Sequence, residues 1–126
     1  MAEDNLGPYS RQISTDSAEA QIAFNRGLIW AYAYNHQKAL SYYRAALEHD
    51  PDCAMAHWGI AYAVGPNYNF EWWMMDPATQ LDALATAFDH TQAALALVDA
   101  VSPVERALIE APRKPDIYGR PTVCKA

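Results

Sequence analysis

The sequence contains few cysteines and few basic side chains. Only two of its 126 residues are cysteine, Cys53 and Cys124, and nine are Lys or Arg, against fifteen Asp or Glu. Two cysteines cannot form the disulfide framework of a small secreted domain, so we expect a reducing, cytoplasmic location. The net charge of −6 argues against nucleic acid as a partner, because phosphate binding requires clustered Lys and Arg.

Long apolar runs and cofactor motifs are also missing. No run approaches the roughly 20 residues of a membrane span, and the acidic start MAEDNLG lacks the basic residues and apolar core of a secretory signal. We therefore expect neither a membrane partner nor a secretory signal. There is no glycine-rich phosphate loop, Cys-x-x-Cys pair or Gly-x-Ser-x-Gly elbow, so we expect no nucleotide, nicotinamide, flavin or haem cofactor.

The residues that are present suit a single packed domain. Apolar residues make up 52 % of the sequence and charged residues 19 %, which is typical of a globular protein. Residues 1–110 carry five basic and fourteen acidic side chains, whereas the last sixteen residues carry four basic and one acidic. We expect a mobile or loosely packed arm at 1–15, a helical domain at 16–111 and a basic, proline-rich tail at 112–126.

Residues 16–111 show helical periodicity and no strand alternation. Within 36–50, apolar residues recur at i, i+1, i+4, i+7 and i+8, which places them on one stripe of a helix; they are Ala39, Leu40, Tyr43, Ala46 and Leu47. The pattern predicts an all-α fold of about five helices. We expect them within residues 18–34, 36–50, 53–65, 77–100 and 103–111.

Capping residues mark where these helices start. We expect Asp16 to cap the first helix, with Glu19 in the reciprocal position, and Asn35 to cap the second. Asp76-Pro77 is a typical start for the fourth, and Ser102 with Glu105 for the fifth. The fourth helix is expected to bury a face made of Leu81, Leu84, Ala85, Phe88, Ala94 and Leu95.

The spacing of small and aromatic residues fits a tetratricopeptide repeat of about 34 residues. With Pro51 as the closing proline, the unit begins at Ala20, and the repeat's packing positions are then occupied by Gly27, Trp30, Ala39, Tyr43 and Ala46. Gly27 would allow two helices to approach closely. Two positions depart from the pattern, because Ala23 stands where Trp is usual and Arg26 where Leu is usual. His57, Ile60, Ala61 and Val64 continue the register in the next helix.

Beyond the spacing, the residues themselves make the sequence similar to the N-terminal region of a family of tetratricopeptide-repeat proteins found in bacteria and fungi. The family has an FNH–EA turn, a DPDCAMAYWGIA helix and a GPNYN loop, which residues 34–36, 50–61 and 65–69 match. The segment SPVERALIEA is similar to the family's following helix, so the resemblance covers residues 17–110. It implies stacked antiparallel helix pairs, and family members usually continue with further pairs, whereas this sequence leaves the pattern at Pro112.

A single repeat cannot bury its own apolar face, because solenoid stability comes from stacking of neighbouring units. We therefore expect the core to be closed in one or both of two ways. The helix predicted at 77–100 could fold back onto the repeat, or a second copy of the chain could pair with it.

An apolar loop, GPNYNFEWWMMDP at residues 65–77, is the first candidate site. Small-molecule sites are mostly apolar with a few polar groups, so the loop could form one wall of a pocket. Its aromatics could instead cover the open side of the repeat or contact another protein, where Trp and Met are enriched; we favour covering or contact. The candidate binding residues are Trp30, Trp58, Asn67, Asn69, Phe70, Trp72 and Trp73.

Histidines are the second candidate, because they titrate near neutral pH. If the chain is an enzyme, we expect His57 or His36 to act as general acid or base with Glu71 or Tyr68, in a cofactor-free isomerisation, cyclisation or elimination. A structural role for His36 in its turn is the favoured alternative. His49, Cys53 and His57 are spaced by four residues, as zinc ligands on a helix would be. Pro51 interrupts that helix and no fourth ligand is in register, so we predict no metal site.

Two functional hypotheses remain. The first is a module for protein–protein or self association, in which the acidic body favours a basic partner. The second is a small-molecule-binding protein or cofactor-free enzyme with an aromatic-lined pocket for a hydrophobic ligand. We favour the first, because helix pairs and an apolar loop are what the residues provide.

Overall fold

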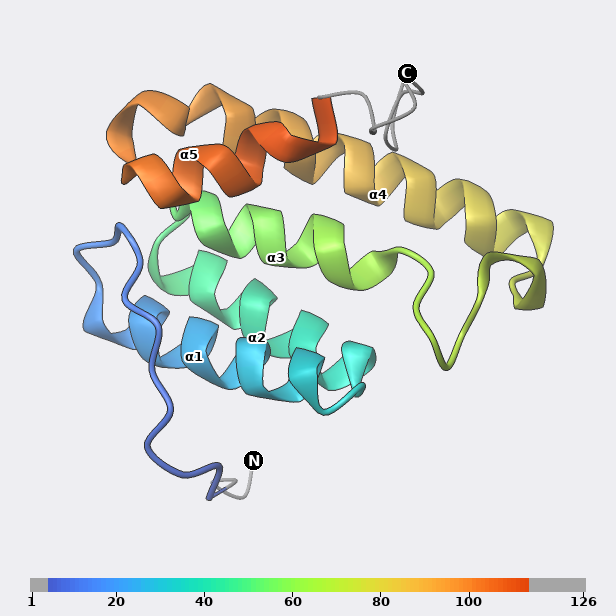
Figure 1. The fold of residues 1–126 in the computed structure, drawn as a ribbon, viewed down its shortest axis with the longest axis horizontal. Coiled ribbons are helices and arrows are strands. Elements are labelled where there is room, and N and C mark those ends of the chain that lie inside the picture. The colour runs from blue at the N-terminus through green and yellow to red at the C-terminus, as the bar shows by residue number, and fades with distance from the viewer. Residues whose placement is uncertain (1–4, 114–126) are drawn as a thin grey trace.

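The computed structural model describes residues 5–113 and confirms the all-α prediction. Within this range it contains five α-helices and no strand (Figure 1). The α-helices are α1 (Ala18–Tyr32), α2 (His36–His49), α3 (Ala54–Val64), α4 (Pro77–Ala96) and α5 (Pro103–Glu110). Three short 3₁₀ helices complete the set: η1 (Trp72–Met74), η2 (Val98–Ala100) and η3 (Ala111–Arg113).

Four of the five helices begin at a side-chain cap. Asn35 accepts from the Lys38 backbone N–H at 3.1 Å, and Asp76 accepts from that of Thr79 at 3.0 Å, as predicted. The first cap was misplaced by one residue. The side chain of Ser17, and not that of Asp16, accepts from the backbone N–H of the third helical residue, because Ser17 is the last residue with an extended backbone.

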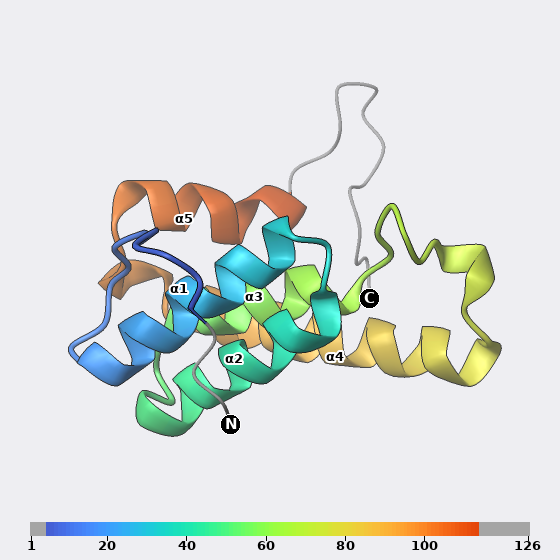
Figure 2. The same ribbon diagram turned by 90° about the horizontal axis from the view of Figure 1, so that it is seen from below.

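The helices stack in chain order, each antiparallel to the next along most of the molecule (Figures 1 and 2). α1 and α2 form the first antiparallel pair, α3 packs on α2, and α4 packs on the far side of α3. α5 covers the ends of α3 and α4. The expected return of the fourth helix onto the preceding helices is therefore present. None of the helices within residues 5–113 is both long and apolar enough to cross a membrane.

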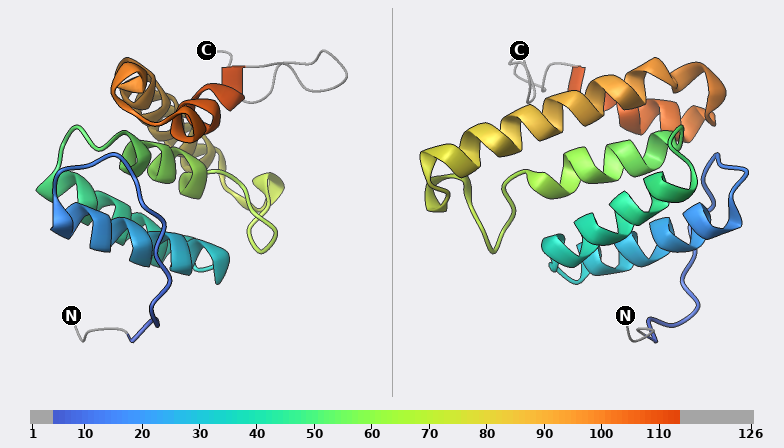
Figure 3. Two further views of the ribbon diagram at one scale, coloured as in Figure 1. Left: turned by 60° about the vertical axis from the view of Figure 1, so that its left-hand side comes forward. Right: turned by 180° about the vertical axis from the view of Figure 1, so that it is seen from behind.

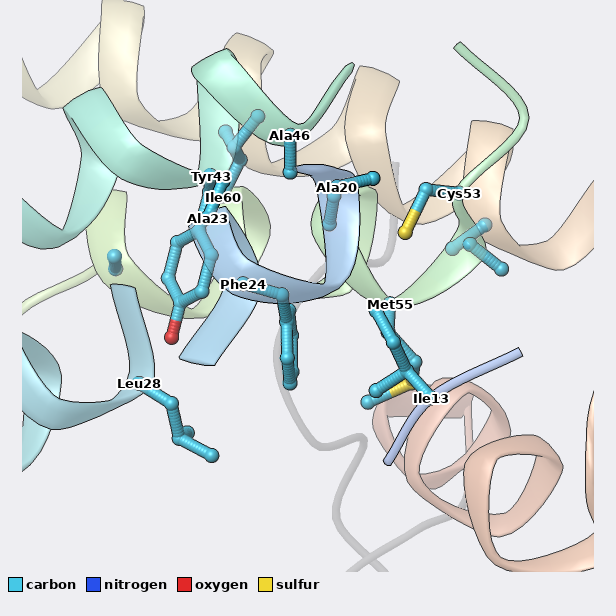
Figure 4. Packing of buried hydrophobic residues seen from close by; sticks show 14 of the residues in the cluster. Ile13, Ala20, Ala23, Phe24, Leu28, Tyr43, Ala46, Cys53, Met55 and Ile60 are labelled. Carbon is cyan, nitrogen blue, oxygen red and sulfur yellow. The ribbon is translucent and has the colours of Figure 1, made fainter. Parts of the chain in front are cut away.

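Tyr43 lies at the centre of the core, between two glycines on different helices. Its side chain is fully buried, and its ring packs against that of Phe24 with centroids 5.6 Å apart (Figure 4). A Cβ added to Gly27 on α1 would stand 2.6 Å from a Tyr43 ring atom, and one added to Gly59 on α3 would stand 2.9 Å away. The predicted close approach at Gly27 is therefore real, and Gly59 provides a second one. Burial raises the pKa of Tyr43 well above its ordinary value.

Part of the N-terminal arm is packed, contrary to the prediction for residues 1–15. Ile13 is buried in the core beside Met55 (Figure 4). The backbone N–H of Ser14 donates to Glu105 on α5 at 2.7 Å, so the arm joins the two ends of the described chain. A buried apolar side chain and a neighbouring hydrogen bond are enough to hold the segment, although its sequence shows no helical periodicity. The tail predicted at 112–126 lies outside the described residues, apart from the two that belong to η3.

α4 differs from its prediction in length and in the face it buries. It ends at Ala96 instead of continuing to residue 100, because residues 98–100 turn as η2 and bury Val98. Of the six residues expected to be buried, only Ala94 is; Leu81 is 68 % exposed and Leu84 is 42 % exposed. At 1.5 Å per residue, α4 is about 30 Å long and α3 only about 16 Å. The first turns of α4 therefore extend beyond α3 (Figure 3).

Candidate functional site

The loop between α3 and α4 has a defined internal structure. Asn67 and Phe70 exchange two backbone hydrogen bonds of 3.1 Å. The Asn67 side-chain oxygen accepts from the backbone N–H of Asn69 at 3.0 Å. η1 is held on α4 by Gln80, whose amide donates to the carbonyl oxygens of Trp72 and Met75. Asn67 therefore shapes the loop with its side chain, a role that the sequence did not reveal.

Most of the loop's aromatic side chains are exposed and do not cover the helices. Only Met75 is buried, whereas Trp73 is 74 % exposed and Tyr68 is 87 % exposed. Trp72 is partly exposed, and Phe70 is exposed. The covering role favoured for this loop thus falls to Met75 alone. The loop runs outward with the first turns of α4 (Figure 2).

One cavity brings together four of the predicted site residues. It measures 370 Å³, and its wall includes His36, Asn67, Asn69 and Phe70, along with Met75. The α1–α2 turn, the end of α3 and the loop meet here, and Tyr34 contributes in a left-handed conformation with φ of 60°. The Nδ1 atom of His36 is buried and has no hydrogen-bond partner among the described residues. A wall with polar groups in an apolar setting is typical of a small-molecule site.

The other predicted site residues lie elsewhere. Glu71 accepts from the indole N–H of Trp73 at 2.8 Å, so its carboxylate is engaged within the loop. The ring of Trp30 is covered by the Lys38 ammonium, 4.1 Å from its centroid. Trp58 stacks on Tyr62 with ring centroids 5.5 Å apart, in the wall of a separate 300 Å³ cavity between α3, α4 and α5. The proposed acid–base set of His57, His36, Glu71 and Tyr68 is therefore not assembled.

His57 bonds to His90 across the α3–α4 interface. Its Nε2 atom lies 3.0 Å from the Pro51 carbonyl oxygen, which can only accept, so Nε2 carries a proton. Its Nδ1 atom lies 2.9 Å from Nδ1 of His90, and in the neutral pair His90 is the donor. Burial, His57 and Arg44 lower the pKa of His90. This pair joins two helices and leaves His57 no free nitrogen for a metal or a substrate.

The spacing of His49, Cys53 and His57 does not produce a metal site. Cys53 is fully buried, and burial raises the pKa of its thiol to about 11. Within residues 5–113, no three His, Cys, Asp or Glu side chains are placed to hold a metal ion. Pro51 separates His49 from the other two by ending α2, as the sequence indicated.

Glu105 is a structural residue whose full role the sequence did not show. It forms the predicted capping box with Ser102, but it is only 5 % exposed and also accepts from the Ser14 hydroxyl at 2.5 Å. Burial alone would raise the pKa of Glu105; the hydrogen bonds from Ser14 and Ser102 outweigh it and lower the pKa below its ordinary value. The capping motif was a visible signal, whereas nothing in the sequence paired residue 14 with residue 105.

No protein-family model, curated protein or solved structure matches the chain.

Proposed function

We propose that the chain is a helical interaction module of tetratricopeptide-repeat type, which binds a protein partner or a second copy of itself. The binding surface is the apolar end of the molecule, defined here as Phe70, Trp73, Met74, Leu81 and Leu84. All five side chains are exposed, and they belong to the loop and the first turns of α4, beyond the end of α3. Their exposure is the observation that carries the proposal.

Two further features support it. Soluble proteins rarely leave large apolar patches uncovered unless the patch binds something. Aromatic residues and Met are also the residue types enriched in protein interfaces. The antiparallel α1–α2 pair, with Gly27 against the Tyr43 ring, is in keeping with the repeat architecture that the sequence resembles.

Photo-crosslinking tests this proposal. A benzoylphenylalanine placed at Trp73 should give discrete protein adducts in extracts of the cells that make the chain. The same group at Tyr32, which is exposed on α1, is the matched control. Adducts at both positions alike, or at neither, would count against a binding surface at the apolar end.

A second candidate function is small-molecule binding in the 370 Å³ cavity, with or without cofactor-free catalysis. The buried, unpartnered Nδ1 atom of His36 beside Asn67, Asn69 and Phe70 is the observation that favours it. A thermal-shift screen of small polar-aromatic ligands should then find compounds that raise the Tm of the wild-type chain. These compounds should lose their effect on a Phe70→Ala variant and keep it on a Trp73→Ala variant, because only Phe70 lines the cavity.

A further inference from the structure

The N-terminal half of α4 carries apolar side chains that the described residues cover only in part. Leu81, Leu84 and Phe88 follow one another at intervals of three and four residues; Leu81 and Leu84 are exposed, and Phe88 is half-buried. This is the a/d spacing of a seam that packs against another helix. We call these three residues the α4 seam.

The seam is distinct from the face that contacts α3. α3 meets α4 at His90, which bonds to His57, and at Ala94, which is buried in the core. At about 100° per residue, His90 lies half a turn around the helix from Leu81. The N-terminal end of the seam is therefore uncovered, as the 68 % exposure of Leu81 and the 42 % exposure of Leu84 show.

The residues beside the seam would admit a close partner helix. Ala85 is exposed at the flanking e position beside Phe88, where a small side chain lets two helices approach; Ala87, at the g position, lines the cavity between α3, α4 and α5. Gln80 and Gln92 occupy the neighbouring flanking positions, so the flanks carry no charge. The charged residues of α4 are Asp82 and Asp89, one position further round the helix.

The charge around the seam has one sign over a long segment. Residues 45–105 contain nine Asp or Glu and not one Lys or Arg. On α4 itself there are Asp82 and Asp89 and no Lys or Arg, so a second copy would bring the same two carboxylates to the interface, and like charges facing each other oppose association. A helix with basic flanks would instead be attracted to this surface.

We infer that the α4 seam binds an amphipathic helix of another protein, with an apolar stripe and Lys or Arg on its flanks. The apolar stripe would pack on Leu81, Leu84 and Phe88, in the helix-to-helix mode by which many proteins recognise partner segments. The basic flanks would lie near Asp82 and Asp89. This inference rests on the proposed function, because it names the partner class for the same end of the molecule.

The test uses the full chain and two synthetic helical peptides of about three heptads. Both have Leu at the a and d positions; one has Lys on its flanks and the other Glu. Fluorescence anisotropy should show that the Lys peptide binds at least tenfold more tightly than the Glu peptide. Leu84→Glu should weaken binding of the Lys peptide at least tenfold. Ile22→Glu, at an exposed apolar position of α1, should leave the affinity for that peptide unchanged.

A charge exchange separates a specific seam from general stickiness. In a variant with Asp82→Lys and Asp89→Lys, the preference for the Lys peptide over the Glu peptide should fall at least tenfold. Because the exchanged residues are exposed, the fold should persist, and far-UV circular dichroism checks it.

Three results would overturn the inference: equal binding of the two peptides, a Leu84→Glu variant that binds as well as the wild type, or a charge exchange without effect. Light scattering could give a fourth result that overturns the inference. A wild-type dimer that Leu84→Glu converts to monomer would assign the seam to a second copy. In each case, adducts from position 73 would show that the proposed function stands while the partner class is wrong. Absence of those adducts would remove the proposed function itself.

Discussion

The two glycines around Tyr43 lead to a prediction about the stability of a Gly27→Ala variant. The substitution should destabilise the wild-type chain and stabilise a chain in which Tyr43 is replaced by a smaller residue. Gly27→Ala adds one methyl group, and its Cβ would lie 2.6 Å from Cε1 and 2.7 Å from Cδ1 of Tyr43. Carbon atoms in van der Waals contact are about 3.5–4.0 Å apart. The ring cannot move away freely, because it is fully buried and a Cβ at Gly59 on the opposite helix would already stand 2.9 Å from it.

The expected cost combines two opposing effects. Overpacking of a well-packed core costs about 1–3 kcal/mol. Replacing Gly by Ala inside a helix contributes about 1 kcal/mol of stabilisation. Because the overlap is close to an ångström and the ring is confined, we expect Gly27→Ala to lower the free energy of unfolding by about 1–2 kcal/mol. For a chain of this length, the Tm should fall by roughly 3–10 °C.

Urea unfolding followed by far-UV circular dichroism measures this change. Gly65→Ala is the matched control, because a Cβ there meets only the Tyr62 carbonyl oxygen at an ordinary 3.7 Å; it should change stability by less than about 0.5 kcal/mol. In a Tyr43→Leu background, Gly27→Ala should become stabilising by up to about 1 kcal/mol, because only the helix-propensity gain remains. The reasoning is refuted if Gly27→Ala is as neutral as the control, or equally costly in both backgrounds.

Three further predictions follow from buried polar groups. Hydrogen bonds hold the pKa of Glu105 below its unfolded value. Its contribution to stability is therefore present above the unfolded pKa and is lost as the pH falls through the folded pKa. Glu105→Gln should make stability less dependent on pH in the acid range and should cost about 1–3 kcal/mol at neutral pH. The pKa of His90 is also lowered, and neutral His90 stabilises the fold, so stability should fall as the pH drops below the unfolded pKa, and a His90→Gln variant should show a smaller fall in the same urea titration. Because Cys53 is buried with a pKa of about 11, a thiol reagent should titrate no more than one of the two cysteines in the native chain and both in urea; two fast-reacting thiols in the native chain would contradict this placement.

Local signals in the sequence predicted the helices well. Asn35, Asp76 and Ser102 carry side chains that can accept from the backbone at a helix start, and all three do so. Such caps depend on residues only three positions apart, so one sequence contains everything needed to identify them. The arm was harder. Ile13 and Ser14 are held by Met55 and Glu105, which are distant in sequence, and no periodicity indicates such a pairing.

The candidate site was predicted in part for the same reason. Asn67, Asn69 and Phe70 are neighbours in one loop, so their shared place in the cavity wall followed from their proximity in sequence. His36 joins them because the α1–α2 turn ends beside this loop. His57 was named as the alternative to His36 on the grounds of its chemistry, yet it faces α4, where His90 occupies its Nδ1 atom. Which face of α3 each neighbour covers depends on the stacking of whole helices, which spacing within α3 does not specify.

The error on α4 has the clearest physical origin. The helix has two apolar stripes: one of large side chains that includes Leu81 and Leu84, and one of small residues that includes Ala87 and Ala94. Burying a Leu side chain contributes about 1.5–3 kcal/mol, so periodicity combined with side-chain size favoured the large stripe as the core. The structure turns the small residues toward α3 instead: Ala94 is buried, and Ala87 lines the cavity between α3, α4 and α5. Since α3 is about half as long as α4, packing the large stripe against α3 would still leave Leu81 beyond its end. A chain that keeps its larger apolar residues on the uncovered stripe has a surface suited to a partner helix, and the acidic segment around it sets the charge that such a partner should carry.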